Sequence, residues 1–244
     1  DAEDAAGADA SGNLEPAESR ELDSTRVAIL GYHDFSRSAA ETEMRIRSSK
    51  FRRQLEVIRD LGLTVISLDQ FIRWKAGELD LPENCVMITI DDGWKAVYTE
   101  AFPILREFGH PFVIFLYKNY IEGGNKALSV KMITEMLQHG ATIGSHSVSH
   151  PYPAEIKQLR EEGVDGFARF LRTEMGESKR YLEMTFGQRV TTYAYPGGFF
   201  TDDMFPLAAE IGYGHLFTVE PGKVTRDSPD RMLPRYMILG THDR

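Results

Sequence analysis

The sequence has little cysteine, few long apolar runs and a deficit of basic residues. Cys85 is the only cysteine among the 244 residues, so no disulfide can form within the chain. No apolar run reaches the roughly 18 residues that a membrane-spanning helix needs, so we expect no transmembrane segment. The 28 Lys and Arg residues against 37 Asp and Glu give a formal net charge of -9. This balance argues against nucleic acid as a partner, because phosphate backbones are bound by clustered Lys and Arg.

A glycine-rich dinucleotide fingerprint is also lacking after the first apolar run, residues 27–30. From that run onward, short apolar segments alternate with longer segments of helical period. Regular alternation of this kind predicts a parallel sheet with helices outside it. Without the fingerprint, a barrel is favoured over a doubly wound sheet. We therefore predict an α/β fold with one domain over residues 26–244.

Residues 1–25 differ in composition from the rest of the chain. They are rich in Ala, Asp, Glu, Gly and Ser and have almost no large apolar side chains. Such a segment buries too little apolar surface to offset its ordering entropy, so we expect a disordered acidic leader. The sequence begins at Asp1 without a Met, and a leader like this often follows a removed signal or lipid anchor. We therefore expect an extracellular, periplasmic or cell-envelope location. Nothing in the sequence indicates the oligomeric state.

The pattern predicts about eight strands, most followed by a helix. The strands are expected at residues 27–30, 64–67, 86–90, 112–116, 141–144, 191–195, 216–219 and 232–239. The main helices are expected at residues 49–61, 97–108, 130–138, 154–186 with a break at Gly163 or Gly176, and 203–211. In barrels of this kind, the working residues lie at the carboxyl ends of the strands.

Two adjacent carboxylates, Asp91 and Asp92, end the predicted strand 86–90. Neighbouring carboxylates repel each other unless a cation or different surroundings separate their roles. One could bind a metal while the other accepts a proton. The alternative is an Asp-Gly turn in which Asp92 caps the following helix.

Two histidines, His146 and His150, follow the predicted strand 141–144. On a helical turn, side chains four residues apart lie on one face and can share a metal ion. Two solvated or core histidines are the alternative. Together with a carboxylate at a neighbouring strand end, the pair leaves room for water, as catalytic zinc sites require.

Other polar and aromatic residues lie at the same predicted strand ends. His33 follows the first strand, and imidazole ordinarily titrates near neutrality, which suits proton transfer; a capping or core histidine is the alternative. Tyr32, Trp94 and Tyr195 have flat apolar faces that suit stacking on sugar rings, although packing at the rim would also explain them.

Three segments resemble the first three motifs of the polysaccharide deacetylases, carbohydrate esterase family four with its NodB-homology domain. They are Thr-Ile-Asp-Asp-Gly at 89–93, His-Ser-Val-Ser-His at 146–150 and Tyr-Pro-Gly-Gly at 195–198. The resemblance covers residues 25–239. It implies a distorted (β/α)7-type barrel and a divalent metal, usually Zn²⁺, with Co²⁺, Ni²⁺ or Fe²⁺ as alternatives.

The resemblance also implies a role for each motif residue. Asp92, His146 and His150 would ligate the metal, Asp91 would be the general base, and the Gly197 N–H would help hold the developing oxyanion. A histidine would then protonate the leaving amine.

The sequence departs from the common family pattern at two places. Ala194 occupies the position of an Arg that orients the base, and Arg235, on the last predicted strand, is a hypothetical substitute. The acid histidine usually follows a strand near the C-terminus, where His242 is the candidate. However, Leu-Gly-Tyr-His at 30–33 resembles the permuted arrangement of poly-N-acetylglucosamine deacetylases, which favours His33 as the acid.

These features together predict a metal-dependent hydrolase that removes N-acetyl groups from the amino sugars of a polysaccharide, an N-acetylglucosamine polymer, with release of acetate. Two alternatives stay open at this point. The same scaffold could hydrolyse an O-acetyl ester or a non-sugar amide, or the chain could bind polysaccharide without catalysis.

Overall fold

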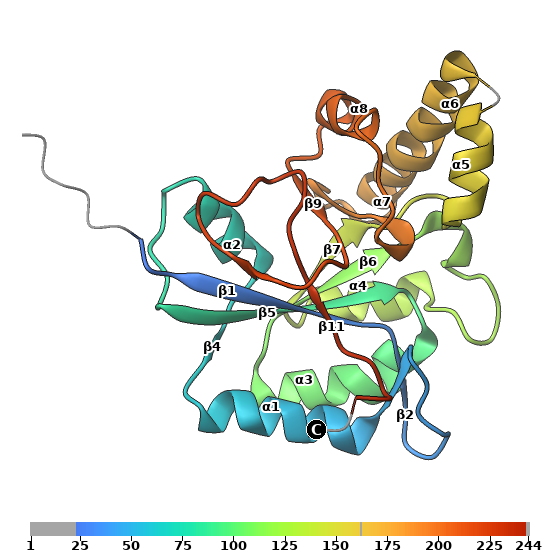
Figure 1. Cartoon of the computed structure of the whole chain (residues 1–244). Coiled ribbons are helices and arrows are strands. Elements are labelled where there is room, and N and C mark those ends of the chain that lie inside the picture. The colour runs from blue at the N-terminus through green and yellow to red at the C-terminus, as the bar shows by residue number, and fades with distance from the viewer. Residues whose placement is uncertain (1–22, 162, 243–244) are drawn as a thin grey trace, which may run out of the picture.

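The computed structural model describes residues 23–161 and 163–242, and its centre is a curled mixed sheet with helices around it (Figure 1). Within the described residues the nine strands of this sheet follow the order β10-β1-β5-β6-β7-β8-β9, with β4 beside β5 and β11 beside β1. The strands are β1 (Arg26–Tyr32), β4 (Thr64–Val65), β5 (Asn84–Asp92), β6 (Phe112–Leu116), β7 (Ala141–Ser145), β8 (Thr192–Ala194), β9 (His215–Phe217), β10 (Lys223–Val224) and β11 (Tyr236–Met237).

The pairing is parallel throughout this sheet except at β10, which runs antiparallel to β1. A second, two-stranded sheet of β2 (Asp34–Ser36) and β3 (Arg45–Arg47) follows β1. The predicted strands 86–90, 112–116 and 141–144 are confirmed, and so is the α/β fold with one domain. The pair β2–β3 was not predicted.

Eight α-helices among the described residues surround the sheet, and short π and 3-10 turns join several of them. The α-helices are α1 (Ser48–Asp60), α2 (Leu68–Lys75), α3 (Phe102–Phe108), α4 (Val130–Leu137), α5 (Pro153–Glu161), α6 (Val164–Leu171), α7 (Ser178–Phe186) and α8 (Met204–Ile211). The other turns are η1 (Val97–Ala101), η2 (Lys118–Tyr120), η3 (Arg172–Glu177) and η4 (Pro196–Gly198). The predicted helix 154–186 breaks at Gly163, whereas Gly176 lies inside η3 without a break.

Alternate residues of the strands divide the core into two layers, as the two-residue period of a strand requires. On β5, Met87 faces an inner cluster that includes Val113 and Phe115 of β6, and α2 packs on this inner side through Phe71. Ile88 and the residues on its side face the outer helices. Asp91 continues the inner column of β5, so its carboxylate points toward the space that the sheet encloses.

The barrel closes irregularly at its C-terminal edge. A continuous strand was predicted over residues 232–239, but only Tyr236–Met237 pairs with β1, and Leu233 makes a single bridge to Phe217 of β9. Pro234 lies between these two contacts, and a proline has no N–H to donate to a ladder. The same segment carries Arg235 into the barrel, where its side chain is fully buried.

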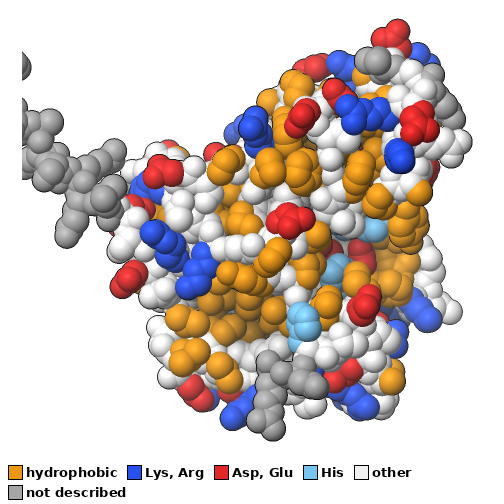
Figure 2. Space-filling view, in the orientation of Figure 1, with side chains coloured by type: hydrophobic (Ala, Val, Ile, Leu, Met, Phe, Trp, Pro, Cys, Tyr) orange, Lys and Arg blue, Asp and Glu red, His pale blue; other side chains and the backbone are white. Residues whose placement is uncertain are grey.

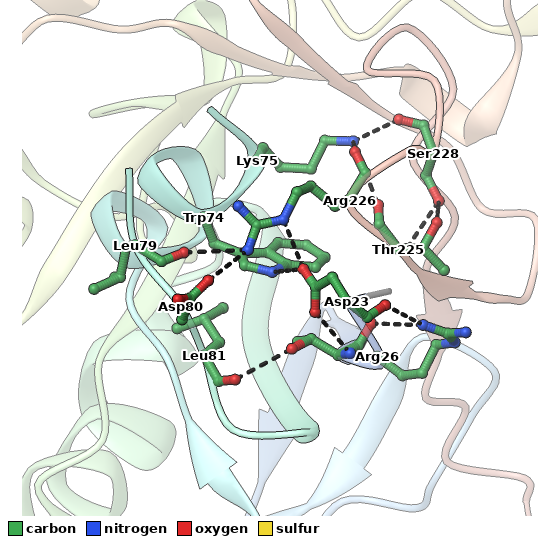
Figure 3. A network of polar contacts seen from close by, with 11 residues as sticks. Asp23, Arg26, Trp74, Lys75, Leu79, Asp80, Leu81, Thr225, Arg226 and Ser228 are labelled. Carbon is green, nitrogen blue, oxygen red and sulfur yellow. Dashed lines mark hydrogen bonds and ion pairs between the residues drawn. The ribbon is translucent and has the colours of Figure 1, made fainter. Parts of the chain in front are cut away.

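The predicted leader lies outside the described residues over positions 1–22, but its last three residues belong to the folded domain. Asp23 accepts hydrogen bonds from the Trp74 indole and from Arg226 (Figure 3). Thr25 is buried and donates to the Leu81 carbonyl. Burial opposes ionisation of Asp23, but hydrogen bonds from Thr25 and Arg226 outweigh it and hold the pKa of this carboxyl well below its usual range. Asp23 and Thr25 therefore contact the domain that was predicted for residues 26–244.

Candidate metal centre and catalytic site

A cleft of about 530 Å³ lies at the carboxyl ends of the parallel strands, as expected for a barrel. In Figure 2, histidine and acidic side chains occupy the floor of a depression that hydrophobic side chains surround. Of the predicted site residues, the structure brings eight to this cleft or directly beneath it. They are His33, Asp91, Asp92, Trp94, His146, His150, Tyr195 and Gly197.

Asp91 is held by a buried guanidinium. Arg235 donates two hydrogen bonds to its two carboxylate oxygens, at 2.7 and 2.8 Å, and both side chains are almost inaccessible to solvent. Burial opposes ionisation, but Arg235 and His146 outweigh it and hold the pKa of the Asp91 carboxyl well below its usual range. Asp91 is therefore ionised at neutral pH. The hypothesis that Arg235 takes the place left by Ala194 is consistent with this bidentate contact.

Asp92 points into the cleft because the backbone leaves the strand conformation there. Its φ is 76°, in the left-handed region that non-glycine residues rarely adopt. The change of direction lets two consecutive carboxylates serve one cleft instead of opposite faces of the sheet. The Trp94 indole N–H donates to Asp92 Oδ2 at 3.0 Å, so Oδ1 is the oxygen that faces the histidines.

Asp92, His146 and His150 form the candidate metal centre. One ligand atom from each lies within 4.8 Å of the other two. The Nε2 atoms of His146 and His150 lie 3.6 and 3.5 Å from Asp92 Oδ1. His146 Nδ1 is 2.8 Å from the carbonyl of Ala194, which fixes the Nδ1–H tautomer and leaves Nε2 free as a ligand. Burial lowers the pKa of His146 to about 4, so its imidazole is neutral, the form that binds metals.

The two histidines do not lie on a helical turn, contrary to the prediction. They belong to an irregular loop between β7 and α5, and Ser147 and His150 have φ values of 81° and 58°. With Asp92, these are three of the four non-glycine residues with positive φ in the described chain. Such conformations persist only where surrounding contacts hold them, and they concentrate at functional sites.

His33 and His242 occupy different places. His33 lines the cleft, and its Nε2 lies 4.0 Å from Asp91 Oδ2. His242 is exposed and is not among the residues that line the cleft. Its N–H donates to the carbonyl of Leu239 at the cleft edge, and its own carbonyl accepts a hydrogen bond from Lys50. Of the two candidate acids, the geometry therefore favours His33.

Of the predicted aromatic and oxyanion residues, three line the cleft and one does not. Tyr195 and Trp94 line the cleft, and so does Gly197, whose φ is 59°. Tyr32 does not reach the cleft. It is 1% exposed, packs against Phe51 at a centroid distance of 5.0 Å and donates to Gln54. Strand alternation turns Tyr32 to the outer layer, so its side chain cannot contact a substrate in the cleft as predicted.

Comparison with known proteins decides the family. The polysaccharide deacetylase family model matches residues 78–216, more than half of the chain. The chain belongs to the polysaccharide deacetylase family. Among the described residues of this family member, no helix is long and apolar enough to cross a bilayer.

Two curated relatives of this deacetylase-family chain cover most of its length. One is the putative polysaccharide deacetylase YxkH of Bacillus subtilis, 28% identical over 87% of this chain and 71% of that protein. The other is the poly-β-1,6-N-acetyl-D-glucosamine N-deacetylase of Staphylococcus epidermidis, 26% identical over 79% of this chain and 68% of that protein.

Solved structures agree on the fold. The deacetylase PplD of Streptococcus pyogenes superposes with a TM-score of 0.76 at 25% identity, over 89% of this chain and 94% of that one. A de-N-acetylase of Aggregatibacter actinomycetemcomitans gives a TM-score of 0.79 at 20% identity, over 90% and 97% of the two chains. The distorted (β/α)7-type barrel is confirmed by these matches.

One buried acid of this deacetylase-family domain was missed by sequence reasoning. Glu174 accepts hydrogen bonds from the backbone N–H groups of Val148 and Ser149, at 3.0 and 2.9 Å, and from the Ser149 hydroxyl at 2.9 Å. It is 6% exposed and comes from the π turn η3. In the sequence it is one acid among several in a polar helical stretch. Its three contacts hold the loop that carries His150 next to His146.

Replacing Glu174 by Ala is therefore expected to weaken metal binding by about 10- to 100-fold, the usual effect of losing a group that orients metal ligands. The loop would lose three hydrogen bonds and with them the fixed position of His150. Competition with a chromophoric zinc chelator measures the affinity. Glu177→Ala, which removes a half-buried acid of the same π turn that is paired with Lys118, is the matched control. Equal affinity of Glu174→Ala and the control would contradict a positioning role for Glu174.

Proposed function

We propose that this chain is a metal-dependent N-deacetylase of an N-acetylglucosamine polymer. Membership of the polysaccharide deacetylase family carries the reaction class. The name of the relative from Staphylococcus epidermidis, a poly-β-1,6-N-acetyl-D-glucosamine N-deacetylase, supports the substrate class. The single structural observation that carries the proposal is the ionised Asp91 beside the Asp92, His146 and His150 cluster at the floor of one cleft.

The residues present fit a divalent ion, and we propose Zn²⁺. Two imidazoles and one carboxylate form the donor set of many catalytic zinc sites. Hydrogen bonds outside the ligand set orient two of the ligands, as in such sites. The Ala194 carbonyl fixes the tautomer of His146, and the Trp94 indole N–H orients Asp92. When bound, a divalent ion lowers the pKa of water and polarises a carbonyl.

In the proposed reaction, Asp91 accepts the proton of the attacking water as the water oxygen forms a bond to the acetyl carbon. The Gly197 N–H donates to the carbonyl oxygen as negative charge develops there. The C–N bond then breaks, and His33 gives a proton to the departing amine, which leaves acetate and a free amino sugar. His33 Nε2 lies 4.0 Å from Asp91 Oδ2, so the proposed acid and the proposed base lie beside each other in the cleft and can serve the same acetamide.

We further propose that the protein acts outside the cytoplasm, at the cell envelope. The substrate class is a polymer of the cell surface, and the composition of residues 1–22 is typical of a linker that follows an export signal or anchor. Fractionation of cells expressing the full-length gene, with detection of this domain by antibody, tests the location.

Acetate release from β-1,6- and β-1,4-linked N-acetylglucosamine oligomers tests the function. The zinc-loaded protein should release acetate, and removal of the metal by a chelator should abolish release until Zn²⁺ is restored. Acetylxylan serves as the O-acetyl comparison. Acetate from the ester alone would favour an esterase, and no release from any acetylated substrate would overturn the proposed function.

A further inference from the structure

A second hollow, of about 450 Å³, adjoins the catalytic cleft. The two share a wall formed by Asp34, Arg45 and Trp94. The indole of Trp94 is held at this junction by its hydrogen bond to Asp92 and by edge contact with Tyr120 at 5.2 Å. A polymer whose reacting unit lies over the metal centre would therefore place its neighbouring unit across Trp94 and into the second hollow.

Backbone hydrogen bonds between residues 93–95 and 126–128 order the far side of this hollow. Lys95 N–H donates to the Lys126 carbonyl at 2.7 Å, and Trp94 and Ala127 form an antiparallel bridge. The Leu128 N–H donates to the Gly93 carbonyl at 2.9 Å. This short ribbon fixes the backbones of Lys95 and Lys126 beside each other, and both residues line the hollow.

The charges of the hollow do not cancel. Its two carboxylates are already paired, Asp34 with Arg45 at 2.6 Å and Glu100 with Arg37 at 2.8 Å. Among the described residues, no hydrogen bond or ion pair holds the ammonium groups of Lys95 and Lys126. The hollow therefore carries two uncompensated positive charges, although the whole chain has a formal net charge of -9.

We propose that this hollow binds the sugar unit next to the one being deacetylated and selects against a neighbour that carries a free amine. An N-acetylated neighbour is neutral, whereas a deacetylated neighbour is cationic and is repelled by Lys95 and Lys126. The inference rests on the proposed function. It has a consequence for the product, because each deacetylation would disfavour reaction at the adjacent unit and space the free amines along the polymer.

The test compares two defined β-1,6-linked tetramers at about pH 6, below the ordinary pKa of an amino group. One is fully N-acetylated, and the other carries one free amine next to an acetylated unit. The zinc-loaded protein should prefer the first by about tenfold in kcat/KM at low salt, the factor that two charges about 6 Å from the amine produce in water. Raising the salt should reduce this preference.

The double variant Lys95→Ala with Lys126→Ala should lose most of the preference while it still releases acetate from the fully acetylated tetramer. Lys131→Ala with Lys223→Ala removes the same charge from exposed positions outside both hollows and should keep the preference. Equal preference in the wild type and the first variant would overturn the inference alone. No acetate release from either tetramer by the wild type would overturn the proposed function and this inference with it.

Discussion

Replacing Asp91 by Asn is expected to reduce acetate release by about 10³-fold, within the range that a positioned general base contributes. An amide cannot accept the proton of the attacking water, yet it keeps the shape of the carboxylate and can still accept a hydrogen bond from Arg235. The ligand set of Asp92, His146 and His150 is unchanged, so the metal should stay bound. Steady-state acetate release and metal content, measured on the same preparation, check both expectations.

The substitution also leaves the buried Arg235 without its counter-ion, so a loss of activity needs a control for folding. The assay is run well below the unfolding temperature of the variant. His33→Ala serves as a second comparison, because it removes the proposed acid and should reduce turnover by about 10² or more. Full activity of Asp91→Asn with metal bound would show that another group is the base.

Replacing Arg235 by Met is expected to lower the free energy of unfolding by about 3–5 kcal/mol, the usual result of removing one partner of a buried ion pair. Asp91 is 1% exposed, and without the guanidinium its charge would have neither solvent nor a bidentate partner. Denaturant unfolding measured at neutral pH gives the difference.

The double variant Asp91→Asn with Arg235→Met separates stability from catalysis. It removes both charges at once, so it should be more stable than Arg235→Met alone while it stays inactive. A double variant that is no more stable than Arg235→Met would mean that Arg235 stabilises the domain through its other contacts, with Thr89 and with the Thr218 carbonyl.

Much of the fold was predictable because strands that pack against both the inner and the outer layer of the core have continuous apolar runs in the sequence. The uninterrupted apolar character of residues 112–116 reflects a strand buried on both faces, and β6 has the same bounds. The edge at residues 232–239 was not predictable in the same way. The apolar pattern spans eight positions, but only Tyr236 and Met237 form a regular strand there. Leu233 makes an isolated bridge to Phe217, and Pro234 interrupts the pairing.

The site was predictable as a set of residues but only partly as a geometry. The strand-end placement of Asp91, Asp92, His146 and His150 depends on topology, which the alternation of strands and helices specifies. The positive φ values of Asp92, Ser147 and His150 could not be predicted from residue type, because none of them is glycine and even Asp and His adopt such values only in a minority of cases. Glu174 was missed because its partners are backbone N–H groups, which every sequence contains.

The anchoring of Asp23 has a mechanical consequence. Asp23, labelled in Figure 3, lies before the start of β1. His33 lines the cleft and follows the end of the same strand, so β1 separates the anchored end of the chain from the cleft. Tension on any polypeptide joined before Asp23 would load its contacts with Trp74 and Arg226 and then the ladder between β1 and β5. The loop that carries His146 and His150 lies outside that line of force. The load would therefore enter at the end of β1 that lies farthest from the cleft, and of the three proposed ligands only Asp92 stands on a strand of the loaded ladder.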